Sequence, residues 1–161
     1  MIIAVTGHRP NKLWGYDLKH PKYKELSDLI KQFLKEHNAT HCISGMALGV
    51  DMVFAISVLK LKRKGLDISL ECAIPCANQP CKWNKQDQDL YYKILNRADI
   101  VTQVSNESYK PWLMQKRNEY MVDKCDVLLA IWDGSDGGTG NCVKYARKVG
   151  KSIHIIDPKS I

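Results

Sequence analysis

Val127-Leu-Leu-Ala-Ile-Trp132, followed by Asp133-Gly-Ser-Asp-Gly-Gly-Thr-Gly-Asn141, is the stretch of the sequence that decides the fold. Its first part is apolar on both faces, which is typical of a central strand in a parallel sheet. Its second part is a glycine-rich turn that leads into a helical pattern over Cys142–Val149. A turn of this kind between a strand and a helix is a place where proteins hold phosphate.

The same alternation of strands and helices extends over the whole chain. The predicted strands are Ile2–Val5, His41–Ser44, Ile68–Ile74, Ile100–Val104, Val127–Trp132 and Ile153–Ile156. The predicted helices are Lys22–His37, a helix from Val50 that ends at Gly65, Gln88–Arg97, Leu113–Lys124 and Cys142–Val149. We therefore predict a single Rossmann-like, doubly wound α/β domain over residues 1–161. Its mainly parallel sheet is covered by helices on both faces, and ligands bind beyond the carboxyl ends of the strands.

The composition is that of a globular protein in water. Of 161 residues, 45% are hydrophobic and 25% are charged. No apolar run approaches the roughly 18 residues that a membrane span needs. The chain runs from Met1 directly into a strand, so we expect no signal peptide, no membrane partner and a cytoplasmic location.

The net charge of +7 favours an anionic partner without identifying it. The densest basic run, Lys60-Leu-Lys-Arg-Lys64, is either a solvated helix end, where cations complement the helix dipole, or a nucleic-acid patch. Among the 6 cysteines, Cys42, Cys72 and Cys125 are expected in the core. The cysteine spacings match no common zinc or iron–sulfur motif, so we expect neither a metal site nor a cofactor.

Polar or glycine-rich segments follow the first two predicted strands. After the first come Thr6, Gly7, His8 and Arg9, where Gly7 permits close approach of a ligand and Arg9 offers a fork for phosphate. The alternatives are a surface Arg9 and a structural, hydrogen-bonded His8. After the second comes Ser44-Gly-Met-Ala-Leu-Gly-Val-Asp51, whose backbone N–H groups lead into a helix N-terminus and attract an anion.

Three of these residues, Gly45, Met46 and Gly49, are predicted donors to phosphate. In this segment Asp51 either contacts the ligand or caps the helix, and a simple tight turn is the alternative for the whole segment. After the third strand, Gln79 is a candidate for base or ribose contacts. Trp83 either stacks on the ligand or packs on the following helix.

The turn after the fifth strand completes the predicted site. We expect its members to form a second phosphate cradle: Gly134, Gly137, Gly138, Thr139 and Asn141. The turn is neither a P-loop nor the GxGxxG dinucleotide fingerprint. Arg117, on the neighbouring helix, would supply charge, and Asn118 a base or ribose contact.

These motifs resemble the SLOG superfamily, and within it the YpsA-like family. The resemblance rests on Thr6-Gly-His-Arg-Pro10, the SGxAxGxD pattern of Ser44–Asp51, Pro75 with Gln79 and Trp83, Arg117-Asn118, and Gly137-Gly-Thr139. The superfamily includes the DNA-processing protein DprA (Smf) and the LOG phosphoribohydrolases. It implies a Rossmann-like fold and a nucleotide-type ligand. Because relatives often pair, it also implies a homodimer.

The LOG enzymes cleave the N-glycosidic bond of nucleoside 5′-monophosphates. Met114-Gln-Lys-Arg117 is similar to their MxxRK motif, so Arg117 resembles their catalytic arginine. Their glutamate falls at about Val143 here, which cannot stabilise positive charge at a ribose. Asp133 is therefore our candidate catalytic carboxylate if the protein is an enzyme, with Asp136 and Asp51 as further substitutes.

Three functions follow from the sequence. The first is binding of a small phosphorylated nucleoside ligand, a nucleotide or nucleotide-derived signalling molecule, by a sensor or sequestering protein. The second is N-glycosidic hydrolysis of such a ligand, with Arg117 and Asp133 as catalytic residues. The third, which we favour least, is single-stranded DNA binding as in DprA, with Trp14, Trp83 and Trp112 as candidates for stacking on bases.

Overall fold

A computed structural model describes all of residues 1–161. It contains a six-stranded sheet in the order β4-β3-β2-β1-β5-β6, in which every neighbouring pair is parallel. The strands are β1 (Ile2–Gly7), β2 (His41–Ser44), β3 (Ser69–Ile74), β4 (Ile100–Gln103), β5 (Val127–Ile131) and β6 (Ser152–Ile156). The predicted doubly wound α/β fold is confirmed.

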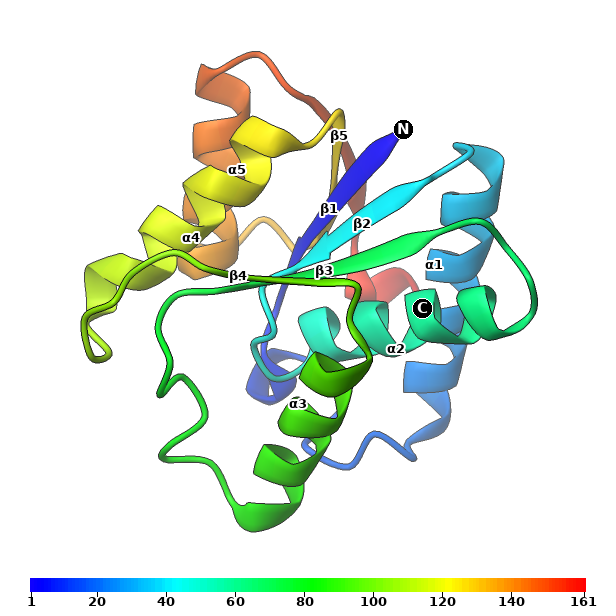
Figure 1. The fold of residues 1–161 in the computed structure, drawn as a ribbon. Coiled ribbons are helices and arrows are strands. Elements are labelled where there is room, and N and C mark those ends of the chain that lie inside the picture. Colours follow the sequence, from blue (N-terminus) through cyan, green and yellow to red (C-terminus); the bar gives the residue numbers. More distant parts are fainter.

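Five α-helices cover the sheet in two layers (Figure 1). The helices are α1 (Pro21–Glu36), α2 (Val50–Arg63), α3 (Lys85–Arg97), α4 (Pro111–Lys124) and α5 (Gly138–Lys148), with short 3₁₀ helices η1 (Pro10–Lys12) and η2 (Pro158–Ser160). Helices α1, α2 and α3 lie on one face of the sheet, and α4 and α5 lie on the other. No helix is both long enough and apolar enough to cross a membrane.

The alternation of side chains along β1 and β5 creates two apolar cores. Ile3 and Leu129 point into the larger core under α1, α2 and α3. Ala4 and Leu128 point into the smaller core under α4 and α5. Because β5 is buried over its whole length, its sequence is a continuous apolar run, as a central parallel strand requires.

Four helices begin earlier than the sequence pattern predicts, α1 and α4 by one or two residues and α3 and α5 by three or four. α5 begins at Gly138, not Cys142, because the end of the glycine-rich segment forms the first helical turn. Glycine carries no side chain and therefore hides helical periodicity. α3 begins at Lys85, not Gln88, and the side chain of Asn84 caps it by accepting from the backbone N–H of Asp87 at 2.8 Å.

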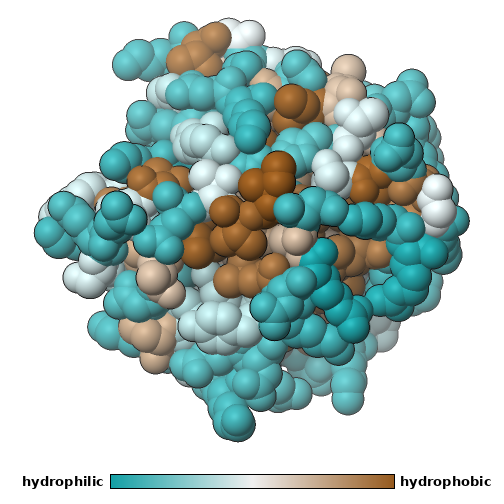
Figure 2. Space-filling view, viewed as in Figure 1, coloured by the Kyte–Doolittle hydropathy of each residue, from teal (hydrophilic) through white to brown (hydrophobic).

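The edge strand β4 exposes apolar side chains to solvent. Ile100 and Val101 are 45% and 46% exposed, although they are adjacent and point to opposite faces of the sheet. In Figure 2 a hydrophobic area lies near the middle of the view, over the region where Figure 1 draws β3 and β4. This edge lies away from the central strands that organise the candidate site.

The strand order places a topological switch point in the middle of the sheet. From β1 the chain winds outward to β4, then crosses over to β5 on the other side of β1. Gly7 at the end of β1 is in register with Ile131 at the end of β5. Segments leaving these two strands diverge here, which is where open α/β sheets bind ligands.

Candidate functional site

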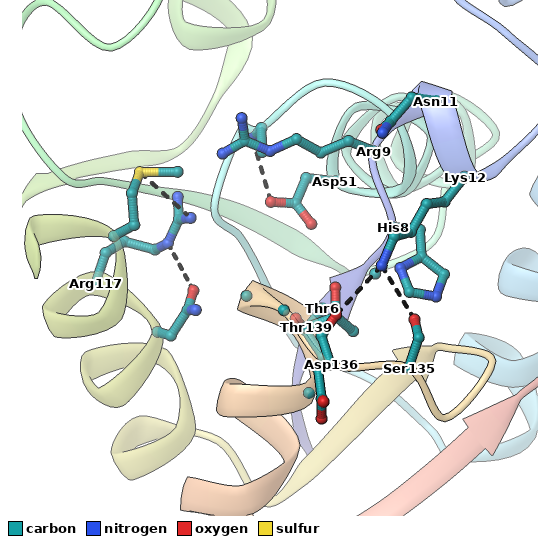
Figure 3. Close-up of a pocket in the computed structure, with 17 residues that line it drawn as sticks. Thr6, His8, Arg9, Asn11, Lys12, Asp51, Arg117, Ser135, Asp136 and Thr139 are labelled. Carbon is teal, nitrogen blue, oxygen red and sulfur yellow. Dashed lines mark hydrogen bonds between the residues drawn. The ribbon is translucent and has the colours of Figure 1, made fainter. Parts of the chain in front are cut away.

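A pocket of about 280 Å³ lies at this switch point. Its walls come from the end of β1, η1, the turn before α2, one side of α4 and the N-terminus of α5 (Figure 3). Of its lining residues only Ala47 and Met114 are classed as hydrophobic, and none is Phe, Tyr or Trp. The pocket therefore suits a polar or charged ligand.

The N-terminus of α5 forms one wall. Gly137 is the residue before the helix, with a φ of 140° that favours glycine, and no side chain caps the helix. The first backbone N–H groups of α5 therefore have no partner within the helix. Together with the helix dipole they form a site that favours an anion.

Arg117 reaches the pocket from α4 and is only 4% exposed. Its Nε donates to Asn118 Oδ1 at 2.9 Å, and its Nη1 donates to the carbonyl oxygen of Gly45. Its Nη2 faces only the sulfur of Met114, at 4.0 Å. Burial lowers the pKa of Arg117, while the nearby Asp51 opposes that shift without forming an ion pair. A buried guanidinium with unused donors and no carboxylate in contact is well suited to hold an anionic ligand.

Asp51 enters the same pocket from the first turn of α2 and is 6% exposed. Its Oδ2 accepts from the backbone N–H of Ala47 at 3.2 Å, while Oδ1 has no hydrogen-bond partner. Burial raises the pKa of Asp51, and the positive charges of Arg117 and Arg9 oppose that effect. Asp51 does not cap α2, since the N-cap residue is Gly49 and no side chain caps the helix; it holds the preceding loop through Ala47 and faces the pocket.

Two more cations approach from the segment after β1. Arg9 is exposed, and its guanidinium forms no hydrogen bond or ion pair within the protein. The Nζ of Lys12 donates to Ser135 Oγ at 3.1 Å and to the carbonyl oxygen of Asp136 at 3.2 Å. Lys12 therefore ties η1 to the glycine-rich turn, and Arg9 is left free above the pocket (Figure 3).

Asp133, the candidate catalytic carboxylate, lies outside the pocket lining. Its Oδ1 accepts from the backbone N–H of Ser135 at 3.0 Å and from Ser135 Oγ at 2.5 Å. The same oxygen lies 2.8 Å from His8 Nε2. Ser135 first, and then His8, lower the pKa of Asp133 well below its usual range, which makes it a weak proton acceptor. The structure therefore gives Asp133 a role in holding the turn, and His8 is its hydrogen-bonded partner.

The turn after β2 contacts Arg117 through the backbone of Gly45, and its glycines, Gly45 and Gly49, do not line the pocket. The carbonyl oxygen of Gly45 accepts from Arg117 and from Gln79 Nε2, the latter at 3.2 Å. Gln79 in turn accepts at Oε1 from Tyr91 Oη at 3.3 Å. A Cβ on Gly45 would lie 2.6 Å from Arg117 Nη1, so glycine is needed for this contact. Gln79 thus shares the carbonyl oxygen of Gly45 with Arg117 and lies outside the pocket lining, where the sequence suggested a base or ribose contact.

The other residues of this turn, Ser44, Met46 and Gly49, also make their contacts within the protein and not with the pocket. Ser44 Oγ donates to the backbone carbonyl of Asp51 at 2.8 Å and accepts from the backbone N–H of Met46 at 3.2 Å. Met46 is fully buried and has a φ of 60°, which is rare for a residue with a side chain. Gly49 has a φ of 94°, and a Cβ there would lie 2.5 Å from the carbonyl oxygen of His8.

The remaining predicted residues divide into two groups. Those brought together around the pocket are Thr6, Gly7, His8, Arg9, Asp51, Arg117, Asn118, Gly137, Gly138 and Thr139. Trp83 lies elsewhere, with its ring against the edge of Tyr91 at a centroid distance of 5.4 Å, so it packs on α3. Asn141 is exposed on α5, and Gly134 lies in the turn, both outside the pocket lining.

Comparison with known proteins identifies the family. The profile described as "YspA SLOG family" (YpsA) matches residues 3–161. This chain belongs to the YpsA SLOG family. It is 34% identical over 146 residues to the SPbeta prophage-derived protein YoqJ of Bacillus subtilis, which covers 81% of this chain and 85% of YoqJ. It is 29% identical over 142 residues to a UPF0398 protein of Brevibacillus brevis, covering 85% and 75% of the two chains.

Solved structures of DNA processing protein A share the fold of this SLOG protein. DprA from Streptococcus pneumoniae matches with a TM-score of 0.68 at 16% identity, over 96% of this chain and 50% of DprA. DprA from Helicobacter pylori, whose structure describes its single-stranded DNA binding mode, matches with a TM-score of 0.69 at 18% identity. That match covers 98% of this chain and 65% of the DprA chain, so the SLOG protein spans about half to two thirds of these structures.

Several pocket residues of the SLOG protein were not in the predicted ligand set: Asn11, Lys12, Ala47, Met114, Ser135, Asp136 and Gly140. The sequence contained one indication for Lys12. Pro10 favours the start of a short helix after β1, and that helix, η1, ends at Lys12 beside the pocket. Val143, at the position of the LOG glutamate, is fully buried. No group of three or more His, Cys, Asp or Glu side chains is arranged to hold a metal ion.

Proposed function

We propose that this SLOG protein binds a phosphorylated nucleoside, either a nucleotide or a nucleotide-derived signalling molecule, as a sensor or sequestering protein. The observation that carries the proposal is Arg117, a buried guanidinium that lines the pocket with unused donors and no carboxylate in contact. An ion held out of water in this way costs free energy unless an opposite charge compensates it. A ligand phosphate between Arg117 and the N-terminus of α5 would provide that charge.

Two features favour binding over N-glycosidic hydrolysis. Asp133 is held by Ser135 and His8 outside the pocket, and its low pKa disfavours a role as general base. Val143 provides no carboxylate at the position where the LOG enzymes have one. A stable complex with an unchanged ligand therefore agrees better with this site than turnover does.

Single-stranded DNA is the alternative partner that the DprA structures suggest. Single-strand grooves combine cations with aromatic side chains on which bases stack. The pocket has the cations but no Phe, Tyr or Trp, its His8 is buried, and Trp83 packs on Tyr91. A small phosphorylated ligand therefore fits the pocket better than a polynucleotide does.

Calorimetric titration with AMP, adenosine and inorganic phosphate at constant ionic strength tests this proposal. We expect AMP to bind with a Kd below roughly 100 μM, about −5.5 kcal/mol, and adenosine to bind at least about tenfold more weakly. Each AMP sample is then analysed for free adenine, whose release would support the hydrolase instead. Equal affinities for AMP and adenosine would contradict phosphate recognition. Should AMP not bind, the same titration is repeated with cyclic dinucleotides and ADP-ribose, and failure of all of them would refute the proposal.

A further inference from the structure

Asp51 is a buried carboxylate in a pocket that is also lined by the cationic side chains of Arg9, Lys12 and Arg117. It is 94% buried, since only 6% of its surface is exposed, yet it forms no ion pair with any of the surrounding basic groups. Its Oδ2 has one donor, the backbone N–H of Ala47, and its Oδ1 has none. An ionised carboxylate can accept about four hydrogen bonds, so most of this capacity is unused. No fully buried side-chain oxygen of the protein lacks a hydrogen-bond partner, so Oδ1 must be open to the pocket, where a bound ligand can donate to it.

The charge of Asp51 determines which part of a ligand can lie beside it. A phosphate next to a carboxylate would be repelled, so the ligand phosphate belongs nearer Arg117 and the N-terminus of α5. The group facing Asp51 must donate hydrogen bonds. In a phosphorylated nucleoside, the donors one sugar ring away from the phosphate are the ribose 2′ and 3′ hydroxyls. Figure 3 shows Asp51 between Arg9 and the pair Thr6 and Thr139, with Arg117 to one side.

The size and lining of the pocket disfavour a deeply bound base. A cavity of about 280 Å³ is at the lower limit for small-molecule sites. Its only apolar lining residues are Ala47 and Met114, neither of which provides the flat surface on which a base stacks. A sugar phosphate, in contrast, needs only the charges and hydrogen-bonding groups that the pocket offers.

We infer that the pocket holds the ribose phosphate part of its ligand, that Asp51 accepts hydrogen bonds from the ribose hydroxyls, and that the base extends outside. This inference rests on the proposed function and specifies its ligand: ribonucleotides are preferred over deoxyribonucleotides, with little selection among bases. The inference also argues against binding of single-stranded DNA in this pocket, because DNA lacks the 2′ hydroxyl.

Titrations with two matched pairs, AMP with dAMP and CMP with dCMP, test the inference. The wild-type protein is expected to bind each ribonucleotide at least about tenfold more tightly than its deoxy partner, as loss of a hydrogen bond to a charged group implies. Exchange of adenine for cytosine is expected to change the affinity less than about threefold. In Asp51→Asn the preference for ribose is expected to fall below about threefold.

Asp136→Asn is the matched control, because it removes the same charge from an exposed position on the rim of the same pocket. It is expected to strengthen the binding of all four nucleotides while keeping the ribose preference. If AMP and dAMP bind the wild type equally well, or if Asp51→Asn keeps the full preference, the inference is wrong although the proposed function stands. If Asp51→Asn does not fold, the wild-type ratios alone decide. Failure of all four to bind refutes the inference, and failure of the other phosphorylated ligands as well refutes the proposed function.

Discussion

Replacement of Arg117 by methionine is expected to lower the affinity for a phosphorylated nucleoside by at least about 100-fold, or roughly 2.7 kcal/mol. The change removes the buried positive charge of the pocket and a fork that matches phosphate geometry. Arg117 forms no ion pair, but the buried Asp51 nearby loses a positive charge that opposes the rise of its pKa, so we expect Arg117→Met to fold with a lowered free energy of unfolding.

Calorimetry with AMP and urea denaturation of the same samples check the two parts of this prediction. Lys116→Met is the control. Lys116 is the exposed neighbour of Arg117 on α4, so this substitution removes an equal charge outside the pocket. Arg117→Lys is expected to restore only part of the affinity, since an ammonium group cannot form the fork. An Arg117→Met protein that binds AMP within about threefold of the wild type would contradict the role of Arg117 in ligand binding.

Replacement of Glu71 by glutamine is expected to lower the free energy of unfolding by about 3 kcal/mol at neutral pH. Glu71 lies on β3, is completely buried and is remote from the pocket lining. Its Oε1 accepts from Lys124 Nζ at 2.8 Å and lies 2.7 Å from His41 Nε2. Its Oε2 accepts from Tyr120 Oη at 2.6 Å and from Thr102 Oγ1 at 2.8 Å. Glutamine cannot satisfy all four donors, so buried groups lose their partners.

The effect of Glu71 depends on pH in a defined direction. Burial alone would raise its pKa, but the surrounding donors, led by Lys124, lower it from 4.5 to about 2. A lowered pKa in the folded state stabilises the fold fully above pH 4.5, and this contribution is lost as the pH falls toward about 2. The stability difference between wild type and Glu71→Gln is therefore expected to shrink over that interval.

Urea denaturation from neutral pH down to about pH 2 measures this difference. Glu25→Gln is the control, because Glu25 is an exposed glutamate on α1 without an ion pair, and its effect is expected to stay within about 0.5 kcal/mol. A Glu71→Gln difference that stays constant through acid pH would show that the charge of Glu71 is not what stabilises this cluster.

The fold was predictable because its strands are short apolar runs separated by amphipathic helices. β5 shows this most clearly, since burial on both faces leaves no polar residue in its sequence. The position of the site followed from the same pattern, because parallel strands bring the segments after β1 and β5 to one edge of the sheet. Arg9, Arg117 and Gly138 could therefore be placed together from the sequence.

The contacts of individual side chains could not be predicted in this way. Gln79 and Trp83 follow a strand at the ligand edge, yet Gln79 turns toward the carbonyl oxygen of Gly45 and Trp83 turns toward Tyr91. The pairing of His8 with Asp133 joins residues that are 125 positions apart. Such orientations depend on tertiary packing, which neither periodicity nor spacing records.

Recovery of a bound ligand tests the central claim most directly. The purified protein is incubated with a pool of nucleoside monophosphates, cyclic mono- and dinucleotides and ADP-ribose derivatives, and unbound material is removed. The protein is then denatured, and the released compounds are identified by mass spectrometry. We predict one intact phosphorylated nucleoside, near one per chain, from the wild type and none from Arg117→Met. Recovery of no phosphorylated compound, or of equal amounts from both proteins, would contradict phosphate recognition at this pocket.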